Sequence, residues 1–231
     1  MKRNVTLAEI SDGRLYGEND MVKADCHGCQ GCASCCSGMG DSIILDPYDV
    51  YRMTVGLGQS FQELLAMGKL TLGVVDGVIL PHLTMVGEKE ECAFLDGDGR
   101  CSIHAHRPGI CRLFPLGRFY DNGDFKYFLQ VGECPAERGK IKVSKWISTP
   151  ALKRNHEFLV GWHYLLNDLE ETVLEEMKEN SGREEEAQKG KQLNMALLQL
   201  FFLTAYDGES DFYEQFEKRL EQFRALQVQI N

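Results

Sequence analysis

The stretch CHGCQGCASCC, residues 26 to 36, holds five of the nine cysteines in a chain of 231 residues. Its spacing is C-x2-C-x2-C-x2-C-C. A disulfide framework, a redox-active dithiol and a metal or iron-sulfur site all use closely spaced cysteines. Two cysteines separated by two residues can direct both thiolates at one metal ion, because the turn between them bends the backbone around it. The rest of the sequence indicates which of these three uses applies.

Composition indicates the setting of these cysteines. The chain is 43% hydrophobic and 10% aromatic, which is typical of a globular protein. Its polar start contains no apolar run suited to a signal peptide, and no later segment reaches the ~20 apolar residues that span a bilayer. We therefore expect a soluble, cytoplasmic protein without a membrane partner. Structural disulfides are rare in the cytosol, so nine cysteines favour a metal site.

The charge of the chain bears on its partners. The formal net charge is -10 at pH 7, and nucleic-acid binding needs a basic surface patch, so we expect no nucleic-acid partner. The acidic residues are concentrated in residues 167–188, which are typical of a solvated helical face followed by a loop. A protein partner or protein substrate remains open, as does the oligomeric state.

A second group of cysteines follows in ECAFLDGDGRCSIHAHRPGICRLFPLGR, residues 91–118. It contains Cys92, Cys101 and Cys111, separated by loop-like spacers, and Cys134 follows in the dipeptide Cys134-Pro135. No cysteine occurs after this position, so the chemistry belongs to the first part of the chain.

Charged and aromatic neighbours accompany the second group. A centre with several thiolates carries negative charge, which the guanidinium groups of Arg107 and Arg112 could offset. His104 and His106 are the histidines best placed to replace a missing cysteine ligand.

Taken together, the two blocks resemble the YkgJ-type cysteine-cluster family, known as the CxxCxxCC zinc- or iron-chelating domain. The resemblance covers roughly residues 26 to 135 and departs from the family pattern at two positions. Cys26 is additional to the motif, and His104 stands where an aromatic residue, usually tyrosine, is expected. The matching positions are Cys29, Cys32, Cys35, Cys36, Cys92, the loop from Asp96 to Cys101, Arg107, Pro108, Cys111, Arg112 and Pro115.

The resemblance implies a metal-chelating domain, commonly described as an iron-sulfur protein. The expected metal ligands are Cys29, Cys32, Cys35, Cys36, Cys92, Cys101, Cys111 and Cys134, with Cys26 in reserve. A flagellin lysine N-methylase is related to the family, so protein lysine methylation is a further hypothesis. The sequence contains no glycine-rich turn after a strand of the kind that would indicate a doubly wound S-adenosylmethionine pocket.

Several hypotheses about the function of the cysteines remain open at this point. All-thiolate coordination suits zinc as well as an iron-sulfur cluster. The ferredoxin-like run and Cys134-Pro135 favour an iron-sulfur cluster with a redox, sensing or structural role, and a structural zinc site is the alternative. A redox dithiol of Cys29 and Cys32 is less favoured, because several overlapping C-x2-C copies occur without a βαβ context.

Local patterns predict an α+β fold. Residues 46–56 and 60–68 are typical of short helices, opened by Asp46 with Pro47 and by a Ser60–Glu63 capping box, and we place Gly56 just past the first of them. Residues 70–83 and 117–131 each contain two strand-like runs around a turn, at Asp76-Gly77 and Asn122-Gly123.

From Thr149 onward the pattern becomes helical. Three helices are expected, and their apolar stripes predict packing surfaces and not cofactor contacts. We divide the chain into an N-terminal extension, 1–25, a loop-rich, metal-stabilised cysteine-cluster domain with small β-hairpins, 26–148, and a C-terminal helical region packed on it, 149–231. The stripes are Trp162, Leu165, Leu166, Leu169, Val173 and Met177, then Leu193, Ala196, Leu197, Leu200 and Phe201, then Phe212, Phe216, Leu220 and Phe223.

Overall fold

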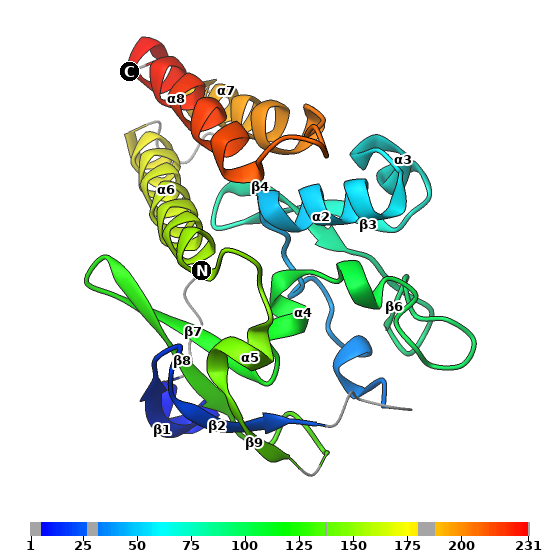
Figure 1. The fold of residues 1–231 in the computed structure, drawn as a ribbon. Helices are drawn as coiled ribbons and strands as arrows, with labels where there is room; N and C mark the ends of the chain where they lie inside the picture. Colours follow the sequence, from blue (N-terminus) through cyan, green and yellow to red (C-terminus); the bar gives the residue numbers. More distant parts are fainter. Residues whose placement is uncertain (1–5, 27–31, 137, 180–187, 231) are drawn as a thin grey trace.

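The protein combines small antiparallel sheets with long C-terminal helices, which confirms the α+β class (Figure 1). The computed structural model describes residues 6–26, 32–136, 138–179 and 188–230. One hydrophobic core runs through the fold, from Val22 near the N-terminus to Phe223 in the last helix. The cysteine-rich part and the helical part are therefore packed on shared apolar residues.

The largest sheet has three strands in the order β1-β8-β7. β7 and β8 form a hairpin whose turn residues, Asn122 and Gly123, have φ values of 49° and 78°. Two left-handed residues suit the twist of a tight hairpin, so the turn expected from Asn-Gly is confirmed. The strands are β1 Ser11–Tyr16, preceded by the short helix α1 Leu7–Ile10, β7 Leu116–Asp121 and β8 Asp124–Gln130.

The N-terminal strands pair with strands that lie more than a hundred residues later in the chain. β1 pairs with β8, and β2 (Met21–Asp25) pairs with β9 (Gly139–Lys142), in both cases antiparallel. The helix α5, Val143–Ile147, follows β9 directly. The division at residue 25 stays a prediction, but residues 11–25 are built into sheets with the segment that follows the cysteines.

A second hairpin and two capped helices lie between the two cysteine blocks in the sequence. β3 (Leu70–Val75) and β4 (Val78–Leu83) pair around Asp76-Gly77, as expected. In α3 (Phe61–Ala66) the side chain of Ser60 accepts the Glu63 N–H, which confirms the capping box. In α2 (Pro47–Leu57) Asp46 caps the first turn, but the helix continues through Gly56 and ends before Gly58, whose φ is 63°. The expected end at Gly56 is therefore wrong by two residues, because Gly58 is the residue that follows the helix.

The C-terminal region is helical, as expected. Its elements are α6 Leu152–Glu179, α7 Gln188–Leu198, the π-helical turn η4 Gln199–Leu203 and α8 Phe212–Ile230. Members of each apolar stripe are buried, including Trp162, Leu197 and Phe216, which confirms that the stripes pack. The Met177 side chain lies outside what the structure describes. α6 starts three residues after Thr149, because Ala151 adopts a left-handed φ of 48° before it.

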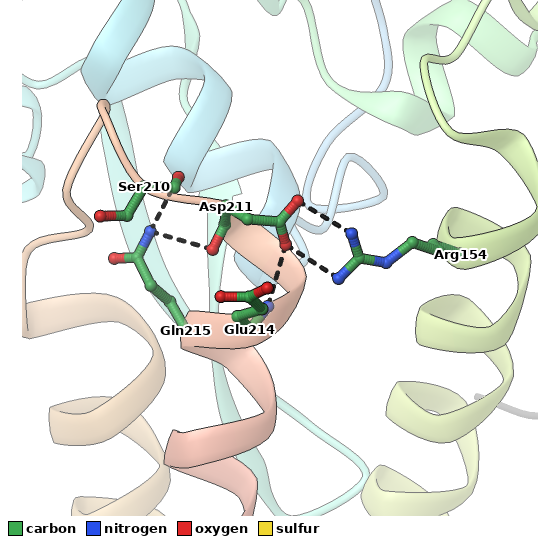
Figure 2. Close-up of polar contacts among 5 residues, drawn as sticks. All are labelled: Arg154, Ser210, Asp211, Glu214 and Gln215. Atoms are coloured by element: carbon green, nitrogen blue, oxygen red, sulfur yellow. Dashed lines mark hydrogen bonds and ion pairs between the residues drawn. The ribbon is translucent and has the colours of Figure 1, made fainter.

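Side chains join the helices to one another and to the second hairpin. Figure 2 shows Arg154 of α6 donating two hydrogen bonds of 2.9 Å to the carboxylate of Asp211, just before α8. Asp211 also accepts the Glu214 N–H, so one carboxylate caps α8 and holds α6. Asn194 of α7 accepts the Ile79 N–H at 2.7 Å and donates to the Gly77 carbonyl at 3.0 Å, which ties α7 to β4 and to the turn before it.

None of the helices in the described ranges combines the length and apolar character that crossing a bilayer requires.

Candidate metal centre

The cysteine-rich segments have little regular structure of their own. Cys35 and Cys36 lie in the three-residue 3-10 helix η1, and Cys92 ends the two-residue strand β6. Cys101 bridges to Leu95, and Cys111 lies in the five-residue helix α4. The elements concerned are η1 Ser34–Cys36, β5 Met85–Val86, β6 Glu91–Cys92, η2 His104–His106 and α4 Gly109–Leu113.

Backbone pairing brings η1 next to β6. Ser37 forms an antiparallel bridge with Glu91, and the Gly38 N–H donates to the Glu90 carbonyl at 3.0 Å. Each of these residues lies one or two positions from a cysteine. The first cysteine block is therefore fastened beside Cys92, although more than fifty residues separate them in sequence.

A tight loop brings Cys101 back toward Cys92. The loop is closed by Asp96, whose side chain accepts hydrogen bonds from the Asp98 N–H at 3.0 Å and from the Arg100 N–H at 2.8 Å. The Asp96 N–H in turn donates to the Arg100 carbonyl at 2.8 Å. The residues between the two cysteines include two aspartates and two glycines, residue types that suit such a loop.

The thiols of the first block influence each other directly. A hydrogen bond donated by the Cys36 thiol lowers the pKa of Cys35 to about 6, and the positive charge of Arg107 adds to this lowering. The same hydrogen bond raises the pKa of Cys36, as do burial and the negative charges of Cys35, Cys92 and Cys111. The shared hydrogen bond therefore favours the proton on Cys36 and the negative charge on Cys35.

The thiols of the second block belong to the same electrostatic neighbourhood. Burial raises the pKa of Cys92, Cys101 and Cys111, and negative charge on Cys35 adds to the rise at all three. Arg107 opposes the rise at Cys101. Five thiols from four separate segments thus lie within electrostatic reach of one another. We name Cys35, Cys36, Cys92, Cys101 and Cys111 the five-thiol cluster.

The remaining predicted ligands are placed differently. Cys32 is half-buried, and its Sγ lies 3.5 Å from the Ser34 hydroxyl. Cys134 is half-buried between β8 and β9, and Cys26 is buried at the end of β2. Cys29 lies outside the described residues. The contacts above join five of the eight expected ligands, and the roles of the other three stay predictions.

The histidines and arginines named from the sequence do not all face the thiols. His104 is exposed, and the ring of His106 packs against Gly56 of α2. Arg107 acts on Cys35 and Cys101, as expected. Arg112 is buried and instead donates to the Thr149 hydroxyl at 2.9 Å, so it joins α4 to the segment before α6.

One residue near the cluster was not found by sequence reasoning. Asp49 is buried in α2, and its Oδ1 accepts the Gly109 N–H at 2.6 Å, at the start of the helix that carries Cys111. Its only sequence signal is its place three residues after Asp46, where a capping box puts an acidic residue.

The donor atoms of the cluster suit a thiophilic metal, since thiolates bind zinc and iron-sulfur clusters. Among the described residues, however, no three His, Cys, Asp or Glu side chains are grouped tightly enough to hold a metal ion. The described cysteines therefore supply the donor chemistry of a metal site but not a closed coordination shell.

Comparison with known families places these cysteines in a recognised domain. Residues 28–134 match the CxxCxxCC family model, described as a candidate zinc- or iron-chelating domain. No curated protein and no solved structure matches the chain, and the expected relation to a flagellin lysine N-methylase is not shown. The matched range contains the whole five-thiol cluster and ends at Cys134. The similarity to the CxxCxxCC family therefore concerns residues 28–134, slightly less than half of the 231-residue chain.

Proposed function

We propose that the chain is an iron-sulfur protein whose cluster is held by thiolates of Cys35, Cys36, Cys92, Cys101 and Cys111, with structural zinc as the alternative. The observation that carries the proposal is the meeting of five thiols from segments far apart in sequence. Cys29, Cys32 and Cys134 remain candidate ligands from the sequence pattern.

Electrostatics supports a bound cation at this place. Burial raises the pKa of Cys92 and Cys111, so each of these thiols resists losing its proton. Metal binding requires thiolates, and a metal ion supplies the positive charge that makes several neighbouring thiolates stable. Arg107 supplies one further positive charge beside Cys35 and Cys101.

The count and spacing of the thiols favour iron-sulfur over zinc. A structural zinc site closes with four ligands, whereas the cluster already offers five thiols and the sequence three more. The C-x2-C-x2-C run also resembles that of ferredoxins. A bound iron-sulfur centre would supply one-electron chemistry, while this chain's residues would hold it, shield it from water and offset its charge through Arg107.

Metal analysis of anaerobically purified protein tests the proposal. We expect a brown protein with broad visible absorption that contains iron and acid-labile sulfide in similar amounts. A colourless protein loaded with zinc would establish the alternative instead. Protein with neither metal, even after reconstitution with iron and sulfide, would contradict metal binding altogether.

Cysteine variants test which thiols bind the metal. Cys35→Ser and Cys111→Ser should each lose most of the metal and lower the thermal midpoint. Cys26→Ser makes the same chemical change at a buried cysteine outside the five-thiol cluster and should keep the metal. Unchanged metal in both Cys35→Ser and Cys111→Ser would show that the two blocks do not share a site.

A further inference from the structure

The helix that carries Cys111 is too short to hold its own position. α4 contains five residues, Gly109–Leu113, and a single turn of helix is unstable in isolation. Its orientation therefore depends on contacts from other elements. One such contact lies at its far end, where the Trp146 Nε1–H donates to the Leu113 carbonyl at 3.1 Å.

One face of α2 supports the chain leading into α4. The Asp49 carboxylate accepts the Gly109 N–H at 2.6 Å, and Arg52 Nη2 donates to the Ala105 carbonyl at 2.7 Å. The His106 ring lies against Gly56, where an added Cβ would be only 2.1 Å from its Nδ1. Asp49, Arg52 and Gly56 are spaced i, i+3 and i+7, so they lie along one face of the helix.

Asp49 is the one member of this face that reaches α4 itself. Only 3% of the residue is exposed, and its other carboxylate oxygen accepts the Asp46 N–H at 3.3 Å. A buried carboxylate is costly unless it is well bonded, so its placement against a helix N-terminus calls for an explanation. An added Cβ at Gly109 would lie 3.4 Å from Asp49 Oδ1, an ordinary van der Waals distance, so the approach does not depend on the missing side chain.

Asp49 also lies close enough to act on the thiol. Burial is the larger cause of the raised pKa of Cys111, and the negative charge of Asp49 is the next. The carboxylate thus lies near the Cys111 side chain as well as at the backbone that orients it.

We propose that Asp49 is a positioning residue for the metal centre, which fixes Cys111 in place through its hydrogen bond to the Gly109 N–H. This inference rests on the proposed metal-binding function. In metal sites, residues that orient a ligand without touching the metal typically change the affinity 10- to 100-fold when they are replaced. Asp49 would be such a residue, although its helix, α2, contains no cysteine.

Three variants of the full-length chain separate positioning from general stability. Asp49→Ala removes the acceptor for the Gly109 N–H. Asp49→Asn keeps an oxygen that can accept it, and so offers rescue. Asp46→Ala is the matched control, because it removes the neighbouring cap of the same helix without touching α4.

Two readouts are needed, one with metal and one without it. The first is the affinity for Co²⁺, a colorimetric probe of thiolate sites, measured by chelator competition. The second is the rate at which an alkylating reagent labels Cys111 in the metal-free protein, with the position mapped by mass spectrometry. We expect Asp49→Ala to weaken Co²⁺ binding at least tenfold and to speed Cys111 labelling by a similar factor. Asp49→Asn and Asp46→Ala should stay within about threefold of the wild type, which is small beside that range.

The outcomes distinguish this inference from the proposed function. Equal losses in Asp49→Ala and Asp46→Ala, or no loss in either, would overturn the positioning role. If the wild type binds no Co²⁺, zinc or iron, the proposed function fails. The labelling rates then decide the inference alone: selective acceleration in Asp49→Ala supports positioning of Cys111, and its absence refutes it.

Discussion

Gly56 shows how a single missing side chain shapes the support of the cysteine domain. It lies inside α2, and an added Cβ would be 2.1 Å from His106 Nδ1 and 2.4 Å from its Cγ. A contact that short means that the ring or the helix must move. From the sequence Gly56 was interpreted as a helix end, because glycine commonly ends helices; the cap is Gly58 instead.

We predict that Gly56→Ala destabilises the protein by about 1–2 kcal/mol, because an overpacked contact costs roughly 1–3 kcal/mol and alanine regains up to about 1 in a helix. In a His106→Ala background the ring is gone, so Gly56→Ala should stabilise by a few tenths to about 1 kcal/mol. Urea unfolding of the four proteins measures this double-mutant cycle. Destabilisation of the same size in both backgrounds would show that the His106 contact is not the cause.

At the scale of elements, the N-terminus of α2 carries two neighbouring carboxylates. Burial raises the pKa of Asp46 to about 7, and the negative charge of Asp49 adds to the rise. Burial raises the pKa of Asp49 as well. Both carboxylates are held by backbone N–H groups, so the first turn of α2 joins a cap to the contact with α4.

Because the pKa of Asp46 is raised, we predict that the free energy of unfolding depends on pH and that Asp46→Asn removes this contribution. The folded chain holds the Asp46 proton more tightly than the unfolded chain, where the pKa is near 3.8. The stabilising contribution of the protonated group is therefore complete below about pH 4 and is lost as the pH rises through about 7. Asparagine caps helices as well as aspartate and stays neutral.

We expect the thermal midpoint of Asp46→Asn, relative to that of the wild type, to increase from pH 5 to about pH 7 and then to level off toward pH 8. A pH series of melting curves at constant ionic strength measures this difference. A difference that does not change with pH would show that Asp46 does not titrate in this range. Ser60→Ala, which removes an exposed cap from α3, is a control that should shift the midpoint equally at each pH.

At the scale of the whole molecule, the sequence predicted what depends on neighbouring residues. The Asn122-Gly123 and Asp76-Gly77 turns, the Ser60 cap and the C-terminal apolar stripes rest on local chemistry, and all were confirmed. The resemblance carried by the two cysteine blocks was confirmed in the same way, since residues 28–134 match the CxxCxxCC family model.

Long-range partners could not be predicted in the same way. Nothing local in residues 11–25 indicates that β1 pairs with β8 or that β2 pairs with β9. Asp49 and Arg112 likewise find partners 60 and 37 residues away, Gly109 and Thr149. Their placement follows from the assembled core and not from any nearby pattern. For this reason the sequence led us to expect that Arg112 offsets the charge of the thiolates, whereas in the structure Arg112 joins α4 to the segment before α6.

The distribution of regular structure predicts where the fold depends on metal. The five-thiol cluster lies on a 3-10 turn, a two-residue strand, a loop and a five-residue helix, whereas α6 and α8 contain 28 and 19 residues. Short elements have few hydrogen bonds of their own, so a shared metal would contribute most of what holds them together. The long helices are held by buried aromatic contacts, such as that between Trp162 and Phe201, whose ring centroids are 5.2 Å apart.

Hydrogen exchange with and without metal should show this division. After metal is removed by a chelator under anaerobic conditions, we expect residues 84–113 to lose amide protection by a factor of about ten or more, since local opening of weak units is governed by their own small free energies. Protection in α6 and α8 should change by less than about threefold on the same reasoning. Cys111→Ser should already exchange like the metal-free wild type and should not respond to the chelator. Equal loss of protection across the chain would instead mean that the shared core makes the protein unfold as one unit, with the metal stabilising both parts alike.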